Sequence, residues 1–242
     1  MFNTADKKYL VYDASMWLVG LFGVAFAIYL GFSAHNASKK SLITRANTIS
    51  QFITAKDIES LAGSSDDLNN KVYNDLKSKL IAINLVNQDI RFVYINGMRN
   101  GKVFFYVDSE NADSAAYSPP GQQYDEASDM MKNLFQSNST GFEVAGDRWG
   151  MWASALVPID DHESGKVVAL LGVDITARKY ITDIFVYSFS SLLLAALIVM
   201  LLSAQKSAIL HMHSAEESLK ANNLEILSLK KIIEKNGNIF DK

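Results

Sequence analysis

Two uncharged apolar runs, one near each end of the chain, constrain this sequence more than any other feature. They cover residues 14–34 and 184–204. A helix needs about 20 apolar residues to cross the hydrocarbon core of a bilayer. Within lipid, a helix also satisfies its own backbone hydrogen bonds. We therefore expect two transmembrane helices that contact the lipid bilayer and hold a separate domain, residues 35–183, between them.

Two crossings place both chain ends on the same side of the membrane. Charge does not decide the side, because Lys39 and Lys40 follow the first run closely and Lys206 follows the second. Long domains also translocate largely regardless of their charge. We expect a two-pass protein of the cell (inner) membrane, with residues 1–13 and 205–242 in the cytoplasm and the middle domain outside.

A cleaved signal peptide is the alternative interpretation of the first run. Asp6 and Asp13 stand where a signal peptide carries its basic region, and no small-residue cleavage pattern follows the run. The run is also longer than the apolar core of a signal peptide. A retained transmembrane helix is the better interpretation.

Composition excludes several classes of function. The chain has 242 residues, 49% of them apolar, and a net charge of −3, whereas a nucleic-acid-binding protein carries a basic stripe. It has no cysteine, so disulfides, thiolate metal sites and cysteine nucleophiles are excluded. The sequence has neither a phosphate-binding glycine loop nor a recognisable catalytic motif. We expect no enzymatic activity, no cofactor, no metal site and no nucleic-acid partner for this chain.

The middle domain begins with helical patterns and then changes to strand patterns. Residues 41–61 continue the helical spacing of the first run, and residues 67–84 form a second helical pattern that Ser65 or Asp66 could cap. A third helix is predicted over residues 123–135. Strands are predicted over residues 90–95, 102–109, 141–145, 151–159 and 166–175. This order indicates an α+β domain with an antiparallel sheet and helices packed to one side.

The last two strands carry a recognisable pattern. Residues 147–155 read DRWGMWASA, and residues 165–174 read GKVVALLGVD. This pair resembles the C-terminal strands of the Cache family, the extracytoplasmic PAS-like sensor domains of prokaryotic membrane receptors, in the single-Cache form found ahead of histidine kinases and diguanylate cyclases. Shorter matches lie at RFVY (91–94), GKV (101–103), VDS (107–109) and SPPG (118–121). The resemblance implies a PAS-like five-stranded sheet whose concave face binds a small molecule.

Three carboxylates are candidates for ligand contacts. The resemblance implies that Asp174, at the end of the last strand, faces the pocket and contacts a ligand amine or a cation. The alternative is a cap for the following helix, because Asp is a favoured N-cap residue. Asp108 and Asp147 lie at predicted strand ends, where turn roles are the alternative. The sequence shows no convergence of oxygens of the kind that a hard metal ion requires.

Aromatic side chains complete the candidate site. Phe92 and Tyr94 share one face of a regular strand, whereas Arg91 lies on the other, so we favour the two aromatics as pocket residues. Small-ligand pockets are aromatic-lined with few polar groups, and an ordinary core is the alternative. The complete predicted set is Phe92, Tyr94, Tyr106, Asp108, Tyr124, Asp147, Trp149, Trp152 and Asp174.

The C-terminal segment has a heptad pattern that predicts a parallel two-stranded coiled coil. Ile226 falls at an a position and Leu229 at a d position, a combination that favours dimers. A single amphipathic helix on the membrane surface is the alternative. The full seam consists of Ala208, Met212, Ala215, Leu219, Asn222, Ile226, Leu229, Ile233 and Asn236.

The first apolar run carries a small-residue pattern as well. Gly23, Ala27 and Gly31 are spaced four apart, as in close-packed transmembrane helices. Together with the heptad pattern, this spacing predicts a parallel homodimer.

These features together predict a dimeric transmembrane signal receptor. Its outer domain would bind a small molecule and act through the second span on a cytoplasmic coiled coil and a signalling partner. One alternative is the input region of a histidine kinase or diguanylate cyclase whose catalytic domain lies beyond residue 242. Another is a ligand-free membrane-anchored scaffold that docks a partner protein, which a filled pocket would favour.

Overall fold

The computed structural model describes residues 4–240, and the side chains of residues 10–231. The chain divides into two compact units. A helical unit comprises Met1–Tyr29 and Ser188–Lys242, and a sheet unit comprises Leu30–Tyr187.

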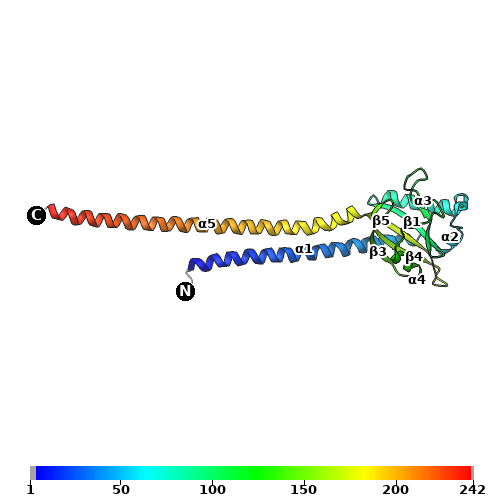
Figure 1. The fold of residues 1–242 in the computed structure, drawn as a ribbon, viewed down its shortest axis with the longest axis horizontal. Coiled ribbons are helices and arrows are strands. Elements are labelled where there is room, and N and C mark those ends of the chain that lie inside the picture. Colours follow the sequence, from blue (N-terminus) through cyan, green and yellow to red (C-terminus); the bar gives the residue numbers. More distant parts are fainter. Residues whose placement is uncertain (1–3, 241–242) are drawn as a thin grey trace. The chain divides into compact units, whose positions relative to one another are not determined.

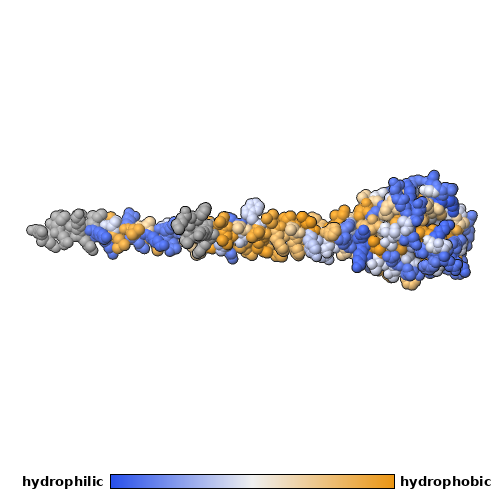
Figure 2. Space-filling view, turned by 90° about the horizontal axis from the view of Figure 1, so that it is seen from below, coloured by the Kyte–Doolittle hydropathy of each residue, from blue (hydrophilic) through white to orange (hydrophobic). Residues whose placement is uncertain are grey.

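The helical unit is built from parts of two long helices, α1 (Thr4–Ser50) and α5 (Ala177–Phe240). Only 11% of the most apolar stretch of α1 and 6% of that of α5 are buried, whereas a core helix of a soluble protein buries its apolar face. Trp17, for example, is 74% exposed. Hydrophobic residues gather along these helices in Figure 2. The two apolar helices fit a two-pass membrane protein.

The sheet unit contains one five-stranded antiparallel sheet with the strand order β2-β1-β5-β4-β3 (Figure 1). This is the α+β, PAS-like fold that the sequence predicts. The strands are β1 (Ile90–Arg99), β2 (Lys102–Asp108), β3 (Gly141–Asp147), β4 (Gly150–Asp160) and β5 (Val167–Thr176).

The two faces of the sheet pack against different elements. On one face, Val93 and Ile95 lie in a core that includes the C-terminal part of α1, α2 (Ala55–Glu59) and α3 (Lys71–Val86). On the other face, Phe92 and Tyr94 pack with α4 (Asp129–Ser137). The prediction that all helices lie on one side is therefore wrong, because α4 covers the second face.

The predicted continuous helix over residues 41–61 is also wrong. Helix α1 ends at Ser50, and α2 starts anew after Thr54. The Thr54 hydroxyl accepts a hydrogen bond from the Asp57 amide at 3.1 Å, and the Asp57 carboxylate accepts one from the Thr54 amide at 3.0 Å. This capping box satisfies two amides that a new helix leaves free. It therefore stabilises a break that apolar spacing does not reveal.

The second and third predicted helices begin later than predicted. A short 3-10 helix, η1 (Ser65–Asn69), precedes α3, and Asn70 caps α3 by accepting a hydrogen bond from the Val72 amide at 2.9 Å. Helix α4 starts only after Ser128, whose hydroxyl accepts from the Met131 amide at 3.0 Å. In both cases a polar cap inside the apolar pattern sets the start of the helix.

The first hairpin is tighter than predicted. Strand β1 continues through Gly97 to Arg99, and Asn100 and Gly101 form the turn with φ values of 53° and 74°. Positive φ at both turn residues is typical of the two-residue turn that matches strand twist, and Asn-Gly is its preferred sequence. This turn sets the register between β1 and β2.

Candidate ligand-binding site

A cavity of about 20 Å³ lies between the second face of the sheet and the loop of residues 109–128. It contains every predicted site residue except Tyr106 and Trp152. Phe105, Ala116 and Ser118 also line the cavity, although the strand and loop patterns did not predict them. The complete lining is Phe92, Tyr94, Phe105, Asp108, Ala116, Ser118, Tyr124, Asp147, Trp149 and Asp174.

Asp174 is the most deeply buried acid of this cavity. It lies in β5 opposite Phe92 of β1 and Ser154 of β4, and it is 3% exposed. The Tyr94 hydroxyl donates a hydrogen bond to its Oδ1 at 3.2 Å. Burial raises the pKa of Asp174 to about 7, and nearby Asp147 and Glu143 also raise it, although hydrogen bonds from Ser154 and Tyr94 lower it.

The structure excludes the alternative in which Asp174 caps the following helix. Strand β5 continues to Thr176, and α5 starts at Ala177. The Thr176 hydroxyl accepts a hydrogen bond from the Lys179 amide at 3.2 Å, which is the capping contact. The Asp174 side chain is therefore free of any role at the helix start.

Gly172 explains how Tyr94 reaches Asp174. Tyr94 of β1 is paired with Gly172 of β5. A Cβ atom on Gly172 would lie 2.2 Å from carbon atoms of the Tyr94 ring. The ring therefore lies flat against the backbone of β5, in space that any other residue type would occupy.

Asp147 organises the aromatic end of the cavity. Its Oδ1 accepts hydrogen bonds from the Trp149 amide at 2.8 Å, the Gly150 amide at 3.0 Å and Trp152 Nε1 at 2.8 Å. Its Oδ2 accepts one from the Tyr124 hydroxyl at 3.1 Å. Asp147 thus has the predicted turn role and also lines the cavity.

Trp152 is held by this network without lining the cavity. Its ring packs edge-on against Phe92, with 5.0 Å between ring centroids. Trp152 therefore supports the part of the cavity wall that Phe92 forms.

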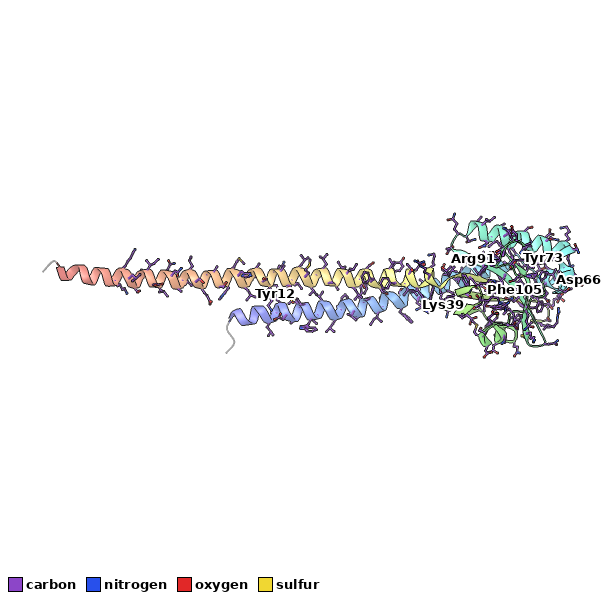
Figure 3. All side chains as sticks on the ribbon, turned by 45° about the horizontal axis from the view of Figure 1, so that its top comes forward. Tyr12, Lys39, Asp66, Tyr73, Arg91 and Phe105 are labelled. Atoms are coloured by element: carbon purple, nitrogen blue, oxygen red, sulfur yellow. The ribbon has the colours of Figure 1, made fainter. Side chains whose placement is uncertain are left out.

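Phe105 is the centre of the aromatic wall. Its ring centroid lies 5.8 Å from Tyr94, 5.4 Å from Tyr124 and 6.0 Å from Trp149. Figure 3 labels Phe105 within the sheet unit. Rings at these distances attract one another beyond their simple burial, so the wall is a mutually supporting group.

Tyr106, which was predicted to line the site, lies outside it because of a β-bulge. The pairing of β1 with β2 passes from Asn96–Phe105 to Ile95–Val107, so Tyr106 has no partner in the ladder. A bulge reverses the alternation of side chains beyond it. Phe105 and Asp108 therefore share the cavity face, whereas Tyr106 packs against the core of the other face.

Asp108 ties the loop over the cavity to α3. Lys77 Nζ lies 2.6 Å from its Oδ1, and the Ser118 amide donates to its Oδ2 at 2.6 Å. Burial raises the pKa of Asp108, although the hydrogen bond from Lys77 lowers it. Lys77 also lies over the Tyr117 ring, 4.3 Å from its centroid, and the Tyr117 hydroxyl hydrogen-bonds with that of Tyr73 at 3.0 Å.

Arg91 does not line the cavity. Its guanidinium pairs with the Glu110 carboxylate and lies 4.0 Å from the centroid of the Phe92 ring. This agrees with the strand alternation, which places Phe92 and Tyr94 rather than Arg91 at the pocket.

The cavity combines acidic and aromatic groups. Three of the residues that line it are aspartates, and no basic residue is among the described side chains that line it. Carboxylates and aromatic faces both attract cations. The present volume is enough for about one water molecule, so a larger ligand requires the wall to move.

Comparison with known proteins gives structural matches only. No protein-family description matches the sequence, and no curated protein matches it. The ligand-binding domain of the Campylobacter jejuni chemoreceptor Tlp3 with L-valine is 18% identical, with a TM-score of 0.47, and the match covers 71% of this chain and 65% of that chain. The same sensory domain with isoleucine has 18% identity, the same coverage and a TM-score of 0.46.

The sensor domain of E. coli DcuS is 12% identical, with a TM-score of 0.43, and the match covers 61% of this chain and 98% of that domain. The chain spans less than two thirds of the length of the two Tlp3 chains. All three structures are described as sensory or ligand-binding domains.

Proposed function

We propose that this chain is a transmembrane receptor whose sheet unit binds a small molecule that carries a positively charged amine. The observation that carries the proposal is Asp174, an acid buried in an aromatic cavity that none of the described basic side chains lines. A buried carboxyl without a cationic partner costs stability. An ammonium group of a ligand would supply that partner, and the faces of Tyr94 and Trp149 would add cation–π attraction.

The same lining favours amines over amino acids. An amino acid ligand also presents a carboxylate, which requires a cation or several donors. Lys77, a basic residue next to the cavity, is already paired with Asp108 at 2.6 Å. Arg91 and Arg148, which lie against rings of the cavity wall, are likewise paired with Glu110 and Glu126. A simple amine or a quaternary ammonium compound therefore fits the charge of the site best.

Binding requires the cavity to enlarge. The loop of residues 109–128 supplies Ala116, Ser118 and Tyr124 to the lining, and loops are the elements that move most readily. We infer that this loop shifts away from the sheet when a ligand enters. A ligand favours the open form only by as much as its affinity differs between the two forms.

The strand that carries Asp174 leads to the output. Strand β5 ends at Thr176, and α5, which contains the second apolar run, begins at Ala177. We propose that the sheet unit lies outside the membrane, that both termini are cytoplasmic, and that a change at Asp174 passes along α5. The C-terminal part of α5 would act as a parallel dimeric coil on a cytoplasmic partner.

Thermal shift measurements on the full chain in detergent test the proposal. The panel contains amines, quaternary ammonium compounds, amino acids and carboxylates. A ligand at 100 times its dissociation constant adds about 2.7 kcal/mol of stability. We expect amines alone to stabilise the protein and Asp174→Asn to abolish their effect, while Asp161→Asn in an exposed turn leaves it unchanged. Stabilisation by carboxylates, or an amine effect that survives Asp174→Asn, would contradict the proposal.

A ligand-free scaffold is the second candidate, and the small cavity volume of about 20 Å³ favours it. The substitution Ala116→Phe separates the two, because it fills the cavity from the loop. A receptor loses its ligand response with this substitution, whereas a scaffold retains its partner in a pull-down. The input region of a kinase or cyclase would use the same binding site. Sequencing the reading frame after residue 242 tests that alternative.

A further inference from the structure

The helical unit contains a close approach between α1 and α5 that is independent of the ligand site. A Cβ atom on Gly23 would lie 2.4 Å from the Cβ atom of Ala195. Ala27 and Ser191, each one turn away on its helix, are also buried, with 6% and 8% exposure. Small residues at these positions let two helix backbones approach closely. The small-residue face of α1 is thus occupied by α5 of the same chain.

A second contact between the same helices lies farther along the unit. Lys206 Nζ and Asp13 Oδ1 are 2.6 Å apart. Figure 3 labels Tyr12, the residue before Asp13, on the part of α1 that lies beside α5. Asp13 immediately precedes the first apolar run, and Lys206 follows the second run closely. The ion pair therefore lies at the polar end of both apolar runs.

The two contacts agree in register. Gly23 and Asp13 are separated by about 15 Å along α1, and Ala195 and Lys206 by about 16.5 Å along α5, at 1.5 Å per residue. Two antiparallel helices in one fixed axial register produce such equal separations. Each contact therefore supports the other.

We infer that α1 and α5 form an antiparallel transmembrane hairpin within one protomer, with its axial register set by Gly23 against Ala195 and by the Asp13–Lys206 ion pair. This inference rests on the membrane crossing and not on the ligand site. It replaces the prediction that Gly23 and Ala27 pack against a second copy. The partner of that face is α5 of the same chain.

The ion pair opposes sliding for an electrostatic reason. In water, an exposed pair of this kind contributes little stability. If one helix slid by a turn, about 5.4 Å, either Asp13 or Lys206 would move toward the hydrocarbon, where charges are costly. Rotation or tilt of the two helices together keeps both contacts. The hairpin thus favours signals that do not slide one helix along the other.

Disulfide crosslinking of the full chain in native membranes tests the hairpin, because the chain has no cysteine of its own. The pair Ala27→Cys with Ser191→Cys is in register. We expect it to form an intramolecular disulfide, seen as a faster-migrating monomer that reduction reverses. The control pair, Ala27→Cys with Val199→Cys, is displaced by about 12 Å, beyond disulfide reach, and should crosslink at least tenfold more slowly. Equal rates for the two pairs would overturn the register.

Single-cysteine variants distinguish packing within a protomer from packing between copies. With Ala27→Cys alone, we expect no crosslinked dimer under the same oxidation. A strong dimer band would show that this face meets a second copy, and it would overturn the assignment to α5. Amounts of each variant in the membrane fraction show whether insertion is retained.

Charge exchange tests the ion pair. In the in-register cysteine pair, Asp13→Lys or Lys206→Asp alone should slow the crosslink by about threefold or more, as expected for an interhelical polar contact. The double exchange, Asp13→Lys with Lys206→Asp, should restore the rate. If a reversed charge impairs membrane insertion, Asp13→Asn replaces Asp13→Lys as the single variant, because it removes the ion pair without placing a second positive charge there. Unchanged rates in the single variants, or a double variant that is no faster than they are, would overturn the role of this pair.

Discussion

At the scale of single residues, Asp174 combines burial, a hydrogen bond from Tyr94 and two acidic neighbours, Asp147 and Glu143. Its pKa in the folded protein, about 7, lies above that of an unfolded chain. Between these two values the folded protein holds a proton that the unfolded chain has released. Folding stability from this group therefore falls as the pH rises through that window.

The substitution Asp174→Asn should remove this pH dependence. Denaturant titrations followed by tryptophan fluorescence should show wild-type stability falling by up to about 1.4 kcal/mol per pH unit between pH 4 and 7 relative to the variant. The stability of the variant relative to the wild type should therefore be highest near pH 8. A difference that stays constant from pH 4 to pH 8 would contradict the burial of an uncompensated carboxyl.

Gly172 is the second residue on which the site depends, because the Tyr94 ring occupies the space of its missing side chain. We expect Gly172→Ala to destabilise the protein by about 2 kcal/mol, as overpacking in a tight core does. In a Tyr94→Ala background the same substitution should cost much less, because the clash is gone. A double-mutant cycle on unfolding free energies measures this coupling, and additive effects would contradict the contact.

At the scale of elements, the site depends on the connection between α3 and the loop of residues 109–128. Lys77 of α3 pairs with Asp108 at 2.6 Å, and both side chains are largely buried, with 13% and 6% exposure. The Ser118 amide donates a hydrogen bond to Asp108, and the Tyr117 ring lies against Lys77. The loop is thus tied to the helix next to the cavity that it covers.

Breaking this connection should be costly. Lys77→Met leaves the buried Asp108 carboxylate without its cation, and we expect a loss of about 3 kcal/mol in unfolding free energy. Lys79→Met, on the exposed side of the same helix, is the matched control and should change stability by less than about 0.5 kcal/mol. Chemical denaturation of the three proteins side by side measures both effects. Similar stability of the two variants would show that the ion pair contributes little.

At the scale of the whole molecule, the C-terminal part of α5 has apolar side chains that are exposed to solvent in a single chain. Leu219, Ile226 and Leu229 of the heptad seam are 65%, 51% and 52% exposed. Ile233 and Asn236, the last two members of the seam, lie outside the described side chains. A parallel two-stranded coil would bury the described seam.

Crosslinking checks the coil directly. Leu219→Cys, at an a position, should form a disulfide-linked dimer of the full chain upon mild oxidation. Glu217→Cys, at an outward f position, should crosslink several-fold more slowly, because its side chains point away from the partner. Equal dimer yields from both positions would favour the alternative of a single surface helix.

Much of the architecture could be predicted from local pattern. Two apolar runs specify two long helices because lipid leaves the backbone no other partner. Strand alternation places Phe92 and Tyr94 on one face, and the structure has them on the cavity. The starts of three helices were missed because Thr54, Asn70 and Ser128 cap those starts inside apolar patterns.

The sequence by itself determined the two apolar helices, the antiparallel sheet and most of the residues around the cavity, because each depends on spacing along one segment. The tertiary structure decided the features that depend on contacts between segments far apart in the chain. The bulge at Tyr106 places Phe105 on the cavity face, the pairing of β1 with β5 joins Tyr94 to Asp174, and the approach of α5 covers Gly23. Local periodicity does not encode which distant partner a face will meet.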